Sequence, residues 1–183
     1  MRIAYSRRQE AEGRRQTDKL LKKKGKNMLD LEFSTDKEET DILSLNHSYI
    51  CSQVLRQLFA YDSIEALTEL TLDIDKGLTP DICVYPADAI APNFSRDVTK
   101  FQQMPVLAIE VISATQNIQT ILEKSERMIQ AGIKVVWAVE PYSRTIFVTT
   151  QAGEIRVYNQ DVESENIKVD FKQIFAGKAA NLV

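Results

Sequence analysis

An acidic residue stands inside an otherwise apolar run of the sequence. The run extends from Val106 to Ile112, and Glu110 is its only polar member. A run of this length is typical of a strand that is covered on both faces. A carboxylate in such a strand loses its hydration unless a cation or hydrogen-bond donors replace the water. Glu110 is therefore a candidate for metal chemistry, although a structural ion pair or an edge position with solvent access explains this residue alone equally well.

A second acidic residue opens a second short apolar strand. Asp81 follows Pro80, which keeps the chain extended, and precedes the run from Ile82 to Tyr85. Two carboxylates side by side on neighbouring strands repel each other, and a divalent cation is the usual means of relieving this repulsion. Pro-Asp alone is a frequent turn element, so Asp81 is informative only in combination with Glu110.

Lys124 has the position needed to complete a charged site. It belongs to a predicted helix whose apolar stripe contains Ile121 and Met128, and it lies at the border of that stripe, about 100° from its centre. From this border the apolar stem can follow the surface between helix and sheet while the ammonium reaches the end of a strand. Most lysines at such a border are simply solvated. Lys124 is therefore a candidate only in combination with Asp81 and Glu110.

Few other residue types could support chemistry. His47 is the only histidine, which weakens any mechanism based on a serine–histidine or cysteine–histidine pair and any histidine-rich metal site. Cys51 and Cys83 are the only cysteines, and neither has a spaced partner of the kind that zinc sites use, so we interpret both as packed thiols. The remaining candidates for catalysis are carboxylates, lysine and a metal ion.

The elements that must position these residues follow from hydrophobic periodicity. Apolar residues at helical spacing predict a helix that is capped by Asn46 and continues through Leu58, and a second helix that begins near Ile118 and ends at Gly132. Alternation predicts a half-buried strand from Ala66 to Ile74, followed by a turn at Lys76-Gly77. Further strands are expected at 82–85, 106–112, 135–139, 145–150, 154–158 and 167–171, with a loop at 86–101. This order predicts an α/β fold with a central mixed sheet flanked by helices.

Charge divides the chain into two parts. Residues 1–30 contain ten Lys/Arg and four Asp/Glu, which leaves thirteen basic and 22 acidic residues for the rest. We expect residues 1–45 to be a basic, partly irregular N-terminal extension and residues 46–183 to form one domain. A basic extension can attract phosphates, but it is also common as a solvated tail. No apolar run is long enough for a membrane helix, so we expect a cytoplasmic protein that does not contact membranes.

The order of the motifs resembles a known family over roughly residues 46–148. The matching segments are Thr79-Pro80-Asp81-Ile82-Cys83-Val84-Tyr85, Pro105 to Ser113, Glu123-Lys124, Ala131-Gly132-Ile133 and Val136-Trp137-Ala138-Val139-Glu140-Pro141. In this order and spacing they are similar to the Uma-type endonucleases, a restriction-endonuclease family abundant in cyanobacteria. The resemblance implies a restriction-endonuclease-like fold and places residues 46–183 among the PD-(D/E)XK nuclease domains.

The resemblance also implies roles for individual residues. Asp81 corresponds to the aspartate of the family's Pro-Asp element, and Glu110 to the acid of its (D/E)XK element. The third position of that element is Ile112, and the lysine of the family is displaced onto the following helix, where Lys124 matches it. The chain departs from the family at Ser113-Ala114-Thr115, where Ser-Pro-Ser is usual. It also departs at Thr120 and Met128, where an aspartate and a tyrosine are common.

We therefore expect an endonuclease that hydrolyses phosphodiester bonds of DNA with Mg²⁺, or with Mn²⁺ in its place. Asp81, Glu110 and the main-chain carbonyl of Val111 would bind the ion, and Lys124 would orient a water molecule or stabilise developing negative charge. A homodimer would suit an enzyme that cuts both strands, but the sequence gives no independent sign of one. The alternative is a catalytically degenerate nuclease fold that binds nucleic acid or a protein partner. A purely structural protein, in which the two acids pair with arginines such as Arg144, is a further alternative.

Overall fold

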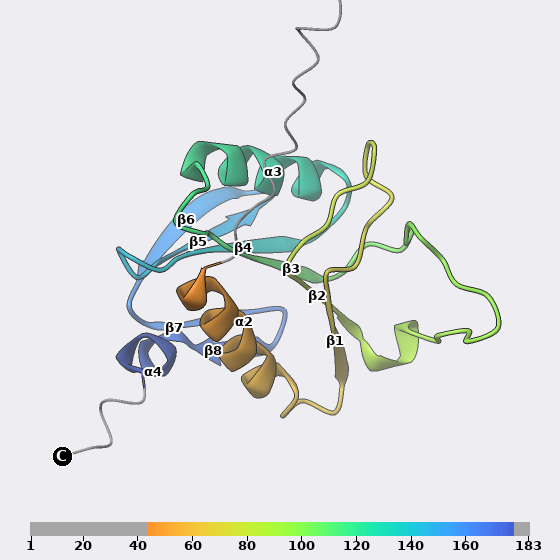
Figure 1. Cartoon of the computed structure of the whole chain (residues 1–183), viewed down its shortest axis with the longest axis horizontal. Helices are drawn as coiled ribbons and strands as arrows, with labels where there is room; N and C mark the ends of the chain where they lie inside the picture. Colours follow the sequence, from red (N-terminus) through yellow and green to blue (C-terminus); the bar gives the residue numbers. More distant parts are fainter. Residues whose placement is uncertain (1–43, 178–183) are drawn as a thin grey trace, which may run out of the picture. The chain divides into compact units, whose positions relative to one another are not determined.

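The computed structural model describes residues 44–177, and these residues form a mixed sheet with helices on both faces (Figure 1). The predicted extension at residues 1–45 lies almost entirely outside the described residues, so the predicted boundary between extension and domain stays a prediction. The sheet contains six strands in the order β1-β2-β3-β4-β5-β6. Their bounds are β1 Ile64–Thr68, β2 Ile82–Pro86, β3 Leu107–Val111, β4 Val135–Glu140, β5 Thr145–Thr150 and β6 Gly153–Tyr158.

Within this sheet, one pair of strands is parallel and the others are antiparallel. The parallel pair is β3 and β4, and the helix α3 (Ile118–Gln130) connects them. A parallel pair needs such a crossover, whereas antiparallel neighbours such as β5 and β6 need only the short turn that ends at Gly153. The mixed α/β fold that the sequence predicts is thereby confirmed.

The two faces of the sheet pack against different elements (Figure 1). On one face, residues such as Ile109 and Trp137 pack against α2 (Leu45–Leu58), against a two-stranded sheet of β7 (Asp161–Ser164) and β8 (Ile167–Asp170), and against α4 (Phe171–Ala176). On the other face, residues such as Ala108 and Val136 pack against Met128 of α3. Strand β3 is covered on both sides, and all five of its residues are buried.

Helix α2 begins two residues earlier than predicted. Ser44, and not Asn46, is the N-cap: its backbone is extended, and its side-chain oxygen accepts a hydrogen bond from the backbone N–H of His47 at 3.2 Å. The prediction of Asn46 was wrong because both residue types make good caps, and Ser44 is the one whose side chain faces the free N–H groups of the first turn. This cap positions the turn that carries His47.

The predicted strand from Ala66 to Ile74 is shorter than expected. Strand β1 ends at Thr68, and Glu69 has a φ of 52°, a left-handed conformation that ends the extended run. The chain then forms a hairpin-like excursion in which Leu72 bridges Leu78, with the predicted turn at Gly77 (φ 118°) between them.

Strand β7 was not predicted, because its four residues contain only one apolar side chain that packs in the core, Val162.

Candidate active site

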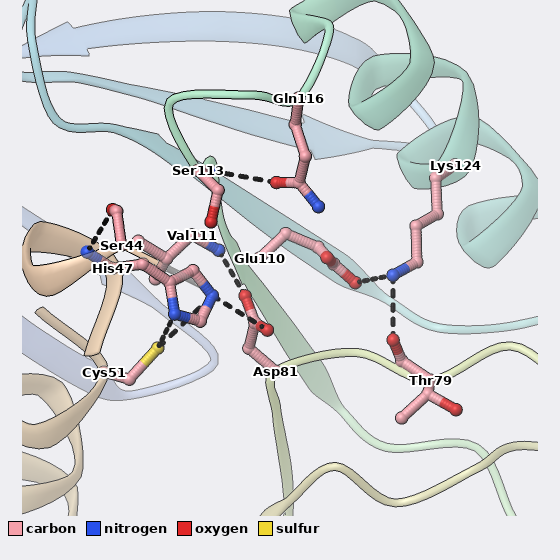
Figure 2. A network of polar contacts seen from close by, with 10 residues as sticks. All are labelled: Ser44, His47, Cys51, Thr79, Asp81, Glu110, Val111, Ser113, Gln116 and Lys124. Atoms are coloured by element: carbon pink, nitrogen blue, oxygen red, sulfur yellow. Dashed lines mark hydrogen bonds and ion pairs between the residues drawn. The ribbon is translucent and has the colours of Figure 1, made fainter. Parts of the chain in front are cut away.

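The two predicted acids lie next to each other at one rim of the sheet. Strands β2 and β3 are antiparallel, and Ile82 is paired with Ile109. Continuing this register by one residue sets Asp81 opposite Glu110. The start of β2 therefore meets the end of β3, and Figure 2 shows the Asp81 carboxylate beside His47 and Val111, and the Glu110 carboxylate directed toward Lys124. The sheet register, which links residues far apart in sequence, is what brings the acids together.

Glu110 is a buried carboxylate with one cationic partner. Glu110 is only 4% exposed, and its Oε1 lies 2.6 Å from Nζ of Lys124. The contact is an ion pair between helix α3 and strand β3. Burial raises the pKa of Glu110 to about 7, and the charge of Asp81 also raises it, while Lys124 lowers it in part. One lysine therefore compensates this carboxylate only incompletely.

Lys124 reaches the rim from α3, as its position at the border of the helical stripe predicts. The helix is capped by Asn117 and held against the sheet by buried residues on the stripe, including Ile121 and Met128. Nζ donates a hydrogen bond to the carbonyl of Thr79 at 2.8 Å in addition to its contact with Glu110. The ammonium is thus fixed from two sides, between the segment before β2 and the end of β3 (Figure 2).

Asp81 contacts both a main-chain N–H and a side chain through its two carboxylate oxygens. Its Oδ2 accepts a hydrogen bond from the backbone N–H of Val111 at 2.6 Å, and its Oδ1 lies 3.1 Å from Nε2 of His47. The contact with Val111 locks the carboxylate against the end of β3. The contact with His47 connects the rim to α2, an element on the opposite face of the sheet from α3.

His47 is the site residue that the sequence did not reveal. It is buried, and its pKa is raised chiefly by its hydrogen bond to Asp81, an effect that burial opposes. Cys51, one helical turn further along α2, places its Sγ 3.9 Å from Nδ1 of His47 and 4.0 Å from Nε2. The sequence feature that could have indicated this pair is the spacing of four residues between His47 and Cys51, which places both side chains on one face of a helix.

Cys51, interpreted from the sequence as a packed thiol, lies in a group with His47 and Asp81 that has the ligand types of a metal site. One donor atom from each lies within 4.8 Å of the other two. Burial raises the pKa of the Cys51 thiol to about 12, so Cys51 is not an activated nucleophile at neutral pH. Cys83 is fully buried in the core and has the same raised value for the same reason.

The donor set at the rim fits a divalent cation. Asp81 and Glu110 contribute two carboxylates, and among the described residues their ion pairs are with His47 and Lys124. Burial already raises the pKa of Glu110 to about 7, so a further positive charge would stabilise the ionised form. Ser113, just beyond β3, has a buried hydroxyl with no hydrogen-bond partner among residues 44–177, as is common where a water or ion binds. Carboxylate oxygens are the ligands that magnesium prefers.

The arginine pairing considered from the sequence does not occur at this rim. The partners of the two acids are a histidine and a lysine, and Arg144 lies in the turn between β4 and β5, where it lines a depression with Pro141 and Ile174. Asp75, another acid near the site in sequence, pairs instead with Arg127 on the outer surface of α3. Among residues 44–177, the arginine contacts of that alternative are therefore not formed.

The sheet order and the helices on its two faces define a restriction-endonuclease-like α/β protein. A family model described as "Uma2: Putative restriction endonuclease" matches residues 37–176, so the chain belongs to this family. The fold is also similar to the crystal structure of "a putative nuclease belonging to DUF820" from Anabaena variabilis ATCC 29413. That match has a TM-score of 0.62 and 19% sequence identity, and it covers 73% of this chain and 82% of the other. No curated protein matches the sequence.

Proposed function

We propose that this protein is an endonuclease that hydrolyses phosphodiester bonds of DNA with Mg²⁺, and that Mn²⁺ can replace Mg²⁺. The observation that carries the proposal is the convergence of Asp81, Glu110 and Lys124 at one rim, with Nζ of Lys124 2.6 Å from the buried Glu110 carboxylate. Membership of a family described as a "putative restriction endonuclease" supports a nucleic-acid substrate. Among residues 44–177, no helix is long and apolar enough to cross a membrane.

The residues that would hold the cation are Asp81 and Glu110, with the main-chain carbonyl of Val111. When bound, the cation would neutralise a phosphate oxygen and lower the pKa of a water molecule beside it. Asp81 is prepared for this role because the Val111 N–H fixes its Oδ2, which leaves the carboxylate little freedom to rotate. Pre-organisation of this kind limits the entropy lost on binding.

Lys124 would act on the substrate as a positioned positive charge. Its hydrogen bond to the carbonyl of Thr79 and its contact with Glu110 hold the ammonium at the rim. A fixed cation there stabilises negative charge that develops on the phosphate and orients an attacking water. The side chain is about one quarter exposed, so a substrate can still approach it.

Nicking of supercoiled plasmid DNA tests the proposal. We expect Mg²⁺-dependent nicking by the wild-type protein and a loss of about 100-fold or more in Asp81→Ala and in Glu110→Ala. Glu163→Ala is the matched control, because Glu163 is an exposed acid on β7, and this variant should keep its activity. Equal nicking rates in all four proteins would contradict the proposed site.

A homodimer, which would suit cleavage of both strands, is to be tested on the same samples by light scattering.

The alternative of a degenerate, nucleic-acid-binding module is motivated by Thr120 and Met128. Thr120 is exposed on α3, whereas Met128 is fully buried against the sheet and cannot contact a substrate. Calorimetry separates the two functions. DNA affinity that falls steeply with salt, without binding of Mg²⁺, would favour the module over the enzyme.

A further inference from the structure

A second set of metal-binding side chains adjoins the carboxylate rim. His47 and Cys51 project from consecutive turns of α2, and Asp81 faces them from the start of β2 (Figure 2). Nitrogen and sulfur ligands are poor partners for magnesium but good ones for zinc and related transition metals. The chemistry of this cluster therefore differs from that of the Asp81–Glu110 pair.

The distances in the cluster are close to those of a tetrahedral site. With the usual zinc–ligand bond lengths, a tetrahedral ion separates a nitrogen from an oxygen ligand by about 3.3 Å and from a sulfur ligand by about 3.6 Å. Here, Nε2 of His47 is 3.1 Å from Oδ1 of Asp81 and 4.0 Å from Sγ of Cys51. The larger difference is to Sγ of Cys51, and a small rotation of the Cys51 side chain would close it.

The surroundings of the cluster also favour a cation. The carboxylates of Asp81, Glu110 and Glu69 all act electrostatically on His47 and on Cys51. The backbone holds the donors in place, since Ser44 caps the turn that carries His47 and Val111 fixes the other oxygen of Asp81. A cation that enters needs little rearrangement of the fold.

We propose that Nε2 of His47, Sγ of Cys51 and Oδ1 of Asp81 form a binding site for a transition-metal cation of the zinc class. Coordination displaces the thiol proton of Cys51 and the proton shared between His47 and Asp81, and both leave to solvent. Three protein ligands leave a fourth position for water. Because the site uses Asp81, its occupation removes one ligand from the magnesium site of the proposed function, but binding itself does not require nuclease activity.

Cobalt titration of the full, reduced, chelator-treated protein tests this inference, because a cobalt–thiolate bond gives a charge-transfer absorption band. We expect the band to saturate at one cobalt per chain in the wild-type protein and to be absent from Cys51→Ser and Cys51→Ala. His47→Ala should weaken cobalt binding about tenfold or more. Cys83→Ala is the matched control and should keep the band, because Cys83 lies in the core and is not one of the three donors.

Two results would overturn the inference: no charge-transfer band in the wild-type protein, or a band that persists in both Cys51 variants. Magnesium-dependent nicking, measured on the same preparations, separates this inference from the proposed function. A band without nicking contradicts the nuclease proposal alone. Nicking without a band contradicts the transition-metal site alone.

Discussion

At the scale of single residues, the ion pair between Glu110 and Lys124 is the contact on which activity should depend most. Burial raises the pKa of Glu110 to about 7, and Lys124 is the main group that lowers it, with a smaller effect from His47. A buried carboxylate that loses its only ion-pair partner tends to become protonated. In the proposed reaction, Lys124 would thus have two effects, one on the substrate and one on the charge state of Glu110.

Substitution of Lys124 by methionine keeps the apolar stem and removes the charge. We expect Lys124→Met to lower the nicking rate by about 100-fold or more, because a positioned cation is lost and Glu110 is ionised less often. Lys134→Met is the control, since Lys134 is an exposed lysine paired with Glu165 outside the site. A Lys124→Met protein that nicks DNA at the rate of the control would exclude a catalytic role for this lysine.

Some site residues could be predicted from the sequence and others could not, for a physical reason. Asp81, Glu110 and Lys124 could be selected because each one violates the pattern of its own segment or lies at its border. Their convergence is now observed, while their catalytic roles remain predictions. His47 conforms to the buried stripe of α2, and its contact with Asp81 depends on how α2 packs on the sheet, which local periodicity does not determine.

At the scale of elements, the cap of α2 supports both stability and the site. The Ser44 side chain satisfies the N–H of His47, so Ser44→Ala should lower the free energy of unfolding by about 1 kcal/mol. Ser48→Ala, an exposed change within the same helix, should have little effect. Urea denaturation followed by circular dichroism measures both. Similar losses in the two variants would mean that the cap contributes nothing specific.

The turn after β4 provides a dependence of stability on pH. Burial raises the pKa of Glu140, but the hydroxyl of Ser143 and the N–H groups of Ser143 and Tyr142 outweigh this effect, so the pKa is lowered overall. A lowered folded-state pKa adds stability above the unfolded value of about 4.3, and this contribution is lost as pH falls through the folded value.

Glu140→Gln should therefore be less stable than the wild-type protein at neutral pH, by about 1 kcal/mol. The difference should shrink as the pH is lowered below about 4, because the wild-type carboxylate then becomes protonated. Denaturation curves across this range measure the difference, and Glu163→Gln, an exposed acid on β7, serves as the control. A difference that is independent of pH would show that the charge of Glu140 is not what stabilises the turn.

Hydrophobic periodicity predicts the buried strands of this protein but not where every strand ends. The buried strands β3 and β4 could be predicted because both of their faces are apolar. The strand expected from Ala66 to Ile74 was too long because alternation continues past Glu69, while the left-handed backbone at Glu69 ends the pairing with β2. A non-glycine residue in this conformation has no clear signature in sequence.

At the scale of the whole molecule, Trp137 joins the central sheet to the C-terminal elements. It is fully buried in β4, its indole N–H donates to Oγ of Ser164 at 3.1 Å, and its ring packs edge-on against Phe171. Trp137→Phe should lower the free energy of unfolding by about 2 kcal/mol, through lost packing and a lost hydrogen bond. Tyr158→Phe, on exposed β6, is the control. Equal stability of both variants would contradict this role.

The fold and the family could be predicted from the sequence because the order of the motifs is specific and the core strands are strongly apolar. The contribution of α2 to the site could not, because it requires the helix to cross the sheet face opposite α3. The two helices meet the rim from opposite faces, one carrying His47 and the other Lys124 (Figure 2). Only the three-dimensional arrangement reveals that Asp81 lies beside both His47 of α2 and the end of β3 that carries Glu110.

The proposed function depends most on the binding of one divalent cation between Asp81 and Glu110. Anomalous diffraction from crystals soaked with Mn²⁺ tests it most directly, because manganese can be located without assuming its ligands. We predict one anomalous peak within bonding distance of both carboxylates, and no such peak in Glu110→Gln. A wild-type crystal in which the carboxylates contact only His47, Val111 and Lys124, with no manganese between them, would contradict the account.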